Sequence, residues 1–482
     1  MSASQFFITL FLIIDLFCII AVIFFERKSP TATVAWLLIL ILLPVVGVVA
    51  YVAFGSGFPA RKKKRYLSKN ARDTLYDDKL KRYLSISQSD YSSNARPFIK
   101  VVNYLRTEAQ SVYTDQNQVQ IFIDGQSKFA SLLNDIRQAR DHIHLFYYIF
   151  KNDRIGRELV AALAEKARQG VRVRVMYDGL GSMMGLSRLF VPLIKAGGRV
   201  RAFDRLLFNL SPYIRINYRN HRKIAVIDGK IGYVGGMNVG DEYLGRNRKY
   251  QPWRDTHLRI TGPAVWFLQE RFWMDWLHAE QADQEPQKLE RYFPEPLPDG
   301  NVGIQIVSSG PDRFESMPIK SGFLQVIYDA EESLLIQSPY FIPDDGFVDA
   351  LRIAARAGVD VRIMLPRKTD NILVQQANMA YAETVMEYGV RVYLYNGFLH
   401  SKTITCDREL VSIGTTNMDI RSFSLNFEIN AFIYNKEIAL AHAAVFEQDL
   451  EHCIELNPAW FSKQSRIERA ICKIARLFAP LM

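Results

Sequence analysis

Two stretches of the sequence decide the fold: NHRKIAVIDGKIGYVGGMN at residues 220–238 and HSKTITCDRELVSIGTTN at residues 400–417. In each stretch a histidine is followed two positions later by a lysine and seven positions later by an aspartate. These residues are His221, Lys223 and Asp228 in the first stretch and His400, Lys402 and Asp407 in the second. An asparagine, Asn238 or Asn417, follows each histidine at 17 residues. A match of this length within one chain indicates a duplicated site.

The residues from each histidine to the motif aspartate have the pattern of a strand. Side chains two positions apart on a strand point to the same face, so each histidine and its lysine share a face. A glycine-containing turn then predicts that the chain reverses and brings the asparagine back beside them.

The duplication extends beyond the motifs. ARQGVRVRVM at 167–176 matches ARAGVDVRIM at 355–364, and each follows a hydrophobic strand and an amphipathic helix. Alternating strands and helices predict an α/β fold, here two tandem repeats that form one bilobal catalytic unit. We place the repeats at 116–285 and 304–460, with a Pro-, Glu- and Gln-rich joint at 286–303 and extra residues at 204–217 in the first copy.

The N-terminal residues 1–58 predict a membrane anchor. Residues 6–25 and 32–54 are almost continuously apolar, and each is long enough to cross a hydrocarbon core of about 30 Å as one helix. We therefore expect a transmembrane helical hairpin. A re-entrant hairpin is the alternative, because Pro44 and Gly47 interrupt the second run. Asp15, inside the first run, suggests helix packing or a homo-oligomer contact.

Basic residues predict the orientation of the chain. The net charge is +10, and RKKKR at 61–65 follows the second apolar run at the start of a basic and polar linker, 59–115. The positive-inside rule then places the catalytic part on the cytoplasmic side of a cell membrane, with the basic cluster near anionic lipids. The C-terminal residues 461–482 predict a basic amphipathic helix, which either lies in the membrane interface or packs on the domain.

Composition excludes several classes of protein. Hydrophobic residues make up 49% and charged residues 23% of the 482, which excludes a disordered chain. Four unrelated cysteines exclude a disulfide scaffold and zinc-like pairing, and no motif of a metal site is present. We expect no cofactor and no metal.

The paired motifs resemble those of the phospholipase D superfamily, over about residues 120–455. The apolar hairpin with TATVAWLLILILLPVVG and the extended forms of both motifs are similar to its bacterial cardiolipin synthase branch. The resemblance implies a membrane-bound phosphatidyltransferase that joins two phosphatidylglycerols into cardiolipin and releases glycerol.

The chemistry of a phosphodiester suits the motif residues. One neutral imidazole can attack phosphorus to form a phosphohistidine, and the other can protonate the leaving alkoxide and then deprotonate the incoming alcohol. By resemblance the nucleophile is His221 and the acid/base is His400. Both lysines, with Asn238 and Asn417, would bind the phosphate oxygens, so no metal is required.

Each catalytic imidazole needs a partner that fixes its tautomer. In the family this is an acidic residue beyond the asparagine, and Glu428, 28 residues after His400, fits. The same offset in the first copy falls on Lys249, so we take Asp255 instead. The motif aspartates Asp228 and Asp407 are expected to hold the two halves together by hydrogen bonds.

Other functions use the same residues. Water as acceptor would make the protein a phospholipase D-type hydrolase, and another alcohol would make it a different phosphatidyltransferase. A nuclease is disfavoured, because much of the positive charge lies where lipid is expected. A non-catalytic scaffold would be expected to have lost motif residues. The expected partners are phosphatidylglycerol and anionic lipids, a homo-oligomer is possible, and nucleic acid is not expected.

Overall fold

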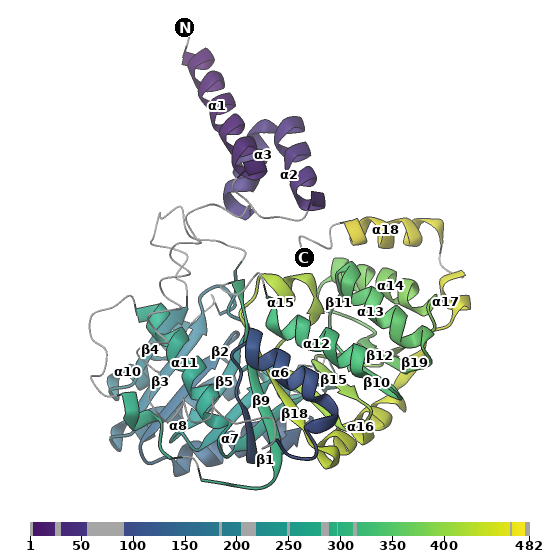
Figure 1. Cartoon of the computed structure of the whole chain (residues 1–482). Helices are drawn as coiled ribbons and strands as arrows, with labels where there is room; N and C mark the ends of the chain where they lie inside the picture. Colours follow the sequence, from purple (N-terminus) through teal and green to yellow (C-terminus); the bar gives the residue numbers. More distant parts are fainter. Residues whose placement is uncertain are drawn as a thin grey trace.

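The computed structural model describes residues 3–24, 30–54, 91–182, 186–203, 218–247, 251–280, 289–295, 297–311, 316–462 and 465–477. Its catalytic body is one broad sheet covered by helices, with three apolar helices outside it (Figure 1). The basic cluster at 61–65 and the extra residues 204–217 lie outside the described residues.

The first repeat supplies one half of the sheet, in the strand order β1-β8-β6-β5-β2-β3-β4. Its strands are β1 Tyr113–Phe122, β2 His142–Tyr147, β3 Arg172–Asp178, β4 Arg199–Phe203, β5 Lys223–Ile227, β6 Ile231–Gly235 and β8 His257–Thr261. Strands β2, β3 and β4 are parallel, as right-handed strand–helix–strand units require.

The second repeat supplies the other half, in the order β19-β13-β12-β10-β15-β16-β18-β9. Its strands are β9 Val302–Ser309, β10 Ser333–Gln337, β12 Asp360–Pro366, β13 Arg391–Tyr395, β15 Thr403–Cys406, β16 Leu410–Gly414, β18 Glu428–Tyr434 and β19 Cys453–Glu455. Antiparallel pairing of β1 with β9 joins the halves into one 15-stranded sheet. The predicted α/β fold with two tandem repeats is confirmed.

Helices cover both halves of the sheet, and buried apolar side chains fill the space beneath them. In the first repeat they are α7 Gly125–Gln138, α8 Arg154–Arg168, α9 Leu186–Leu189, α10 Val191–Lys195 and α11 Val265–Glu280. In the second they are α12 Pro318–Asp329, α13 Asp345–Arg356, α14 Ile372–Met386, α15 Ile420–Ser424 and α16 Lys436–Leu450. Asp124, Asp153 and Asp344 accept hydrogen bonds at the N-termini of α7, α8 and α13, which satisfies backbone donors there.

We expected residues 59–115 to be a linker, and for residues 99–108 this prediction is wrong. Helix α6 Ile99–Glu108 lies within that range and packs against α12 and β9 of the second repeat. Val101, Val102 and Leu105 on one face of α6 are fully buried. Their helical spacing gives α6 one apolar face. That face is buried in the core of the second repeat, although α6 precedes the first repeat in the sequence.

The second apolar run is two helices and not the single one expected. Helix α1 Ala3–Phe24 matches the first run, but the second run forms α2 Pro30–Leu42 and α3 Pro44–Phe54. Pro44 has no N–H to continue a helix, and the chain reverses there. Gly47 lies so close to Ile39 that a Cβ would be 2.8 Å from its carbonyl oxygen, and the rings of Trp36 and Tyr51 meet at 5.4 Å.

A helix that crosses a membrane must be both long and apolar. Among the described residues no helix meets both requirements. Asp15 is buried in the N-terminal helices, where Cys18, Val22, Leu40 and Val48 form a small apolar core.

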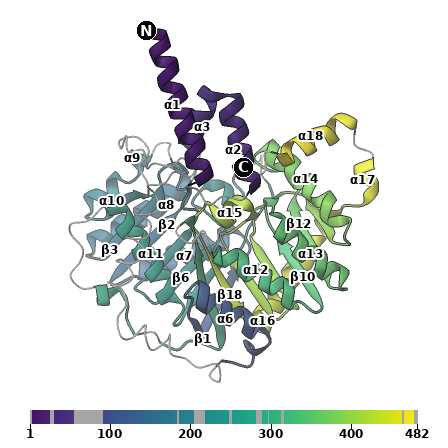
Figure 2. The same cartoon turned by 45° about the horizontal axis from the view of Figure 1, so that its top comes forward.

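The C-terminal segment comprises α17 Pro458–Ser462 and α18 Arg466–Leu477. Helix α18 packs on α14: Cys472 and Ala475 are buried, and Arg476 donates to Thr384 Oγ1 at 3.2 Å. The opposite face presents Ile467, Ile471 and Ile474 to the outside. Both views place α18 at the end of the body that carries α1–α3 (Figures 1 and 2).

Candidate active site

The two motif histidines lie at the seam between the repeats, each held by backbone of the other repeat. The backbone N–H of His221 donates to Phe427 O at 2.9 Å. The N–H of His400 donates to Arg254 O at 2.7 Å, next to the short pairing of β14 Phe398–Leu399 with β7 Trp253–Arg254. The site therefore exists only when both repeats are assembled.

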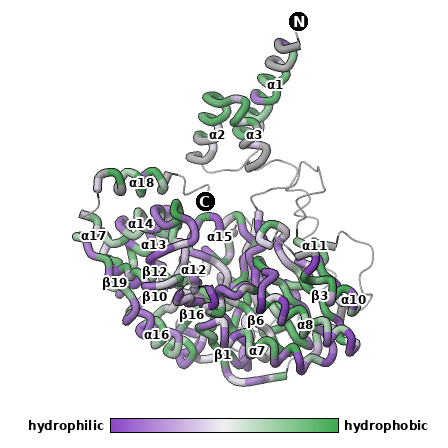
Figure 3. The backbone as a smooth tube through the Cα atoms, turned by 180° about the vertical axis from the view of Figure 1, so that it is seen from behind, coloured by the Kyte–Doolittle hydropathy of each residue, from purple (hydrophilic) through white to green (hydrophobic). Residues whose placement is uncertain are grey.

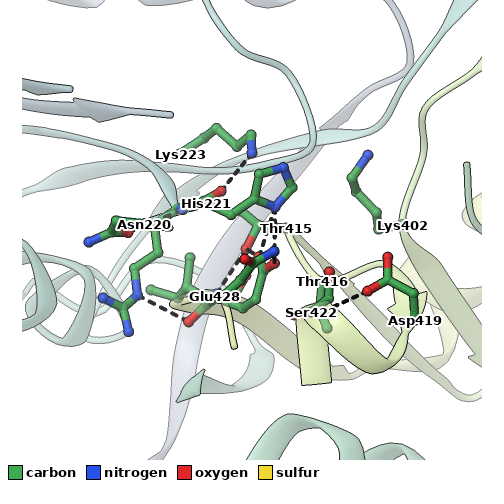
Figure 4. A network of polar contacts seen from close by, with 12 residues as sticks. Asn220, His221, Lys223, Lys402, Thr415, Thr416, Asp419, Ser422 and Glu428 are labelled. Atoms are coloured by element: carbon green, nitrogen blue, oxygen red, sulfur yellow. Dashed lines mark hydrogen bonds and ion pairs between the residues drawn. The ribbon is translucent and has the colours of Figure 1, made fainter. Parts of the chain in front are cut away.

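A buried carboxylate holds each imidazole. His221 Nδ1 lies 3.0 Å from Glu428 Oε1 (Figure 4). His400 Nδ1 lies 2.7 Å from Asp255 Oδ2. Both carboxylates are fully buried. The partners cross between repeats, whereas the offset along the sequence implied a partner in the same copy. A proton on Nδ1 leaves Nε2 with the lone pair that a nucleophile or base needs.

Burial keeps both imidazoles neutral. It lowers the pKa of His221 to about 4 against the opposing effect of Glu428, and Lys223 lowers it further. Burial and then Lys402 lower the pKa of His400 to about 4, with Asp255 acting in the opposite direction. In the site without substrate both rings are therefore neutral at pH 7. A phosphodiester anion between them would raise both values, which supplies the proton that a general acid needs.

The motif lysines are also buried. Lys223 Nζ donates to His221 O at 2.6 Å, and Lys402 Nζ donates to His400 O at 2.5 Å. Burial lowers the pKa of Lys402 to about 8, although Asp255 and Glu428 oppose the shift. Lys402 is thus mainly charged at neutral pH and can neutralise a phosphate oxygen.

The two asparagines are not equivalent. Asn238 uses its amide within the protein: Oδ1 accepts from Ile149 N at 3.1 Å, and Nδ2 donates to Tyr243 Oη at 2.6 Å. Asn417 is 4% exposed, bonds through its side chain to Asp419, and leaves its Oδ1 without a partner. We expected the two asparagines to bind the phosphate oxygens in the same way, but their contacts within the protein differ.

The motif aspartates do not join the halves, and that expectation is wrong. Asp228 accepts from the backbone of Arg140, Asp141 and His142 in its own repeat, at 2.7 to 2.9 Å. Asp407 likewise accepts from the backbone of residues 331–333, at 2.7 to 2.9 Å. Each aspartate follows the far end of its strand, β5 or β15, so its reach is limited to the neighbouring turn.

Arg222 also joins the repeats beside the site. Its guanidinium donates to Asp275 at 2.8 Å, to Ser309 O at 3.0 Å and to Glu428 O at 3.0 Å. Burial opposes ionisation of Asp275, but Arg222 and Arg271 outweigh it and hold its pKa below the usual value. In the sequence, the only signal for this role of Arg222 is its position between His221 and Lys223, which places a charged side chain on the opposite face of the motif strand.

Aromatic side chains surround both histidines. The ring of Tyr148 lies 4.9 Å from that of His221, and the rings of Trp253 and Phe398 lie 5.6 and 5.9 Å from that of His400. These side chains limit water around the imidazoles, which favours transfer over hydrolysis. Among the described residues, no group of three or more His, Cys, Asp or Glu side chains could hold a metal ion.

The comparisons with known proteins agree with this geometry. The family described as "Cardiolipin synthase, PLD-like domain" matches residues 132–252 and 323–450, and "Phospholipase_D-nuclease N-terminal" matches residues 13–56. The major cardiolipin synthase ClsA of Bacillus subtilis is 42% identical over 496 residues and is covered in full, as is this chain. A cardiolipin synthase of Staphylococcus aureus is 43% identical over 476 residues, covering 98% of this chain and 95% of that protein.

Among solved structures, the fold is similar to that of phosphatidylserine synthase from Haemophilus influenzae. The TM-score is 0.58 at 14% identity, and the match covers 79% of this chain and 98% of the other. At this identity the likeness concerns the fold alone.

Proposed function

The chain belongs to the phospholipase D-like cardiolipin synthases, and from that premise we propose that it transfers a phosphatidyl group through His221 to a second phosphatidylglycerol. Its activity is phosphatidyl transfer that yields cardiolipin. The proposal concerns the residues that carry each step, the acceptor and the membrane anchor.

In the first step His221 Nε2 attacks the phosphorus of the donor. A P–N bond forms, the P–O bond to the glycerol head group breaks, and His400 gives its proton to the leaving glycerol oxygen. Lys223 and Lys402 stabilise the charge on the non-bridging oxygens.

In the second step the acceptor alcohol displaces His221 from phosphorus. His400 takes the proton from a hydroxyl of the second phosphatidylglycerol, whose oxygen attacks phosphorus. The P–O bond of cardiolipin forms as the P–N bond breaks, and His221 is free again. One glycerol is released for each cardiolipin.

The observation that carries this proposal is the crossed pair of histidine–carboxylate contacts at the seam. It provides two buried imidazoles, His221 and His400, each with Nδ1 against a buried carboxylate and a lysine alongside. Two such imidazoles are what a two-step transfer through a covalent intermediate requires.

Helices α1–α3 are proposed to insert into the bilayer. Large apolar side chains are exposed on these helices, among them Phe17, Phe24 and Leu42, and the helices are mainly hydrophobic (Figure 3). An exposed apolar surface of this extent favours a lipid environment. At 1.5 Å per residue, the 13 residues of α2 span only about 20 Å, so α2 and α3 suit a re-entrant hairpin. The basic cluster 61–65 favours a catalytic body on the cytoplasmic side.

The test uses the purified full chain in vesicles that contain labelled phosphatidylglycerol. We expect cardiolipin and glycerol in equal amounts, and neither from a His221→Ala variant. Phosphatidic acid as the main product would refute transfer and identify a hydrolase. Another phosphatidyl ester in mixed-lipid vesicles would refute the choice of acceptor.

A further inference from the structure

Asp419 is a buried carboxylate that the transfer mechanism does not use. It is 7% exposed and lies on the same side of the site as Lys402 (Figure 4). One of its oxygens accepts from Ser422 N at 2.6 Å and so caps the first turn of α15. Burial raises the pKa of Asp419 to about 6, so it is mainly ionised at neutral pH.

A second polar pair continues from Asp419 toward the outside. β11 Phe341–Ile342 pairs in parallel with β17 Met418–Asp419, which places Tyr340 beside Asn417. Tyr340 is half-buried, and its hydroxyl donates to the exposed carboxylate of Asp370 at 2.7 Å. Tyr340 also lies within the electrostatic influence of Asp419, so these polar groups form one continuous set.

Asn417 provides independent evidence that a ligand binds here. Its Oδ1 is a buried acceptor without a hydrogen bond. An acceptor that is desolvated and unpaired destabilises the fold, so such a group in a site indicates that a substrate donor pairs with it. The equivalent oxygen of Asn238 has a backbone partner.

The charge of the set restricts what it can bind. A phosphate group would be repelled by Asp419 and Asp370, and Asn417 Oδ1 can only accept. Hydroxyl groups are donors that fit all three. The first repeat has Gly240 where the second has Asp419, each two residues after the asparagine, so a carboxylate at this position is particular to the His400 side.

We propose that Asp419, Asn417 and the Tyr340–Asp370 pair bind the free hydroxyl groups of a glycerol head group next to His400. The set thereby selects glycerol alcohols as leaving group and as acceptor. This inference rests on the acid/base role of His400 proposed above, because that role places the alcohol on this side of the site.

The experiment measures alcohol selectivity with the full chain. A phosphatidyl ester of p-nitrophenol serves as donor, and glycerol and 1-propanol compete as acceptors. The informative variant is Asp419→Asn, because asparagine also caps a helix and only the charge is lost. Since a hydrogen bond to a charged group is worth about 1.5–3 kcal/mol, the glycerol-to-propanol product ratio should fall roughly 10- to 100-fold.

Three further variants complete the test. Tyr340→Phe should lower the same ratio by a smaller factor, because its hydroxyl is only one of the contacts. Asp419→Ser keeps a capping oxygen and should behave as Asp419→Asn does. Asp349→Asn is the matched control, since this exposed aspartate pairs with Arg352 on the same helix, α13, and its ratio should be that of the parent.

Two results would overturn the inference. An unchanged product ratio in both Asp419 variants would make Asp419 a structural cap only. A variant that loses transfer to ethanolamine, offered as a third alcohol, but not to glycerol would identify an amine site. Failure of the proposed function looks different, because the parent itself would then release no p-nitrophenol or make no transfer product.

Discussion

Replacing Arg222 by methionine should loosen the seam on which the active site is built. The guanidinium is buried and joins Asp275 of the first repeat to the backbone of Ser309 and Glu428 in the second. Methionine has a similar length but no donors, so the carboxylate of Asp275 loses its bidentate partner and two carbonyl groups lose their donors.

The size of the effect follows from these contacts. Removing one partner of a buried ion pair costs about 3–5 kcal/mol. Arg271 still lies 2.6 Å from Asp275, so the lower end of that range, about 3 kcal/mol, is expected. In a protein of this size, a loss of 1 kcal/mol in the free energy of unfolding lowers Tm by about 2 °C, so Tm should fall by about 6 °C.

The assay is thermal unfolding of the detergent-solubilised full chain, followed by tryptophan fluorescence. A double variant, Arg222→Met with Asp275→Asn, should recover part of the loss, because no carboxylate is then left with an incomplete partner and the amide oxygen can still accept from the buried Arg271. Arg352→Met, which breaks an exposed ion pair with Asp349, is the control and should change Tm by less than about 1 °C. A fall below 2 °C in Arg222→Met, or no recovery in the double variant, would refute the assignment of Arg222 as a stabilising contact between the repeats.

Three further predictions concern catalysis. Glu428→Gln removes the charge that stabilises the positive ring of His221 once Nε2 is bonded to phosphorus, so kcat should fall by about 10²- to 10⁴-fold with KM little changed, and an unchanged kcat would contradict the role. The profile of kcat/KM should rise with pH through about 4, where His221 becomes the neutral nucleophile, and fall above about 8, where Lys402 loses its charge; a flat alkaline limb would exclude Lys402 as the charged group. Activity should survive EDTA, since the lysines supply the positive charge, and loss in EDTA that Mg²⁺ restores at fixed ionic strength would contradict this.

The repeats and the paired motifs could be predicted because their signals are local. The spacing of His221, Lys223 and Asn238 recurs within a short stretch, and strand alternation is visible there without tertiary information. Glu428 and Asp255 could also be singled out by position. Which histidine each contacts could not, because that depends on how the two repeats assemble across β1 and β9.

Other features of the structure could not be predicted, because they depend on tertiary contacts that the spacing of residues in the sequence does not show. The reach of Asp228 and Asp407 is limited by the far ends of their strands, and only the assembled sheet shows which turn lies there. Helix α6 has a short apolar face in a polar stretch, and its partner is a repeat that begins some 200 residues later. For the second apolar run, hydropathy alone predicted one helix, although Pro44 was the local signal for two.

The division of labour between the histidines is the central claim, and covalent trapping tests it most directly. A phosphatidyl ester of p-nitrophenol needs no proton for its leaving group, so a His400→Ala variant should still form a phosphatidyl-enzyme. Without its base that variant should pass the group on very slowly, and intact-protein mass spectrometry after an acid-free quench should find the adduct accumulated on His221. A His221→Ala variant should carry none. An adduct on His400 in the His221→Ala variant would reverse the roles, and no adduct in either variant would contradict the two-step mechanism.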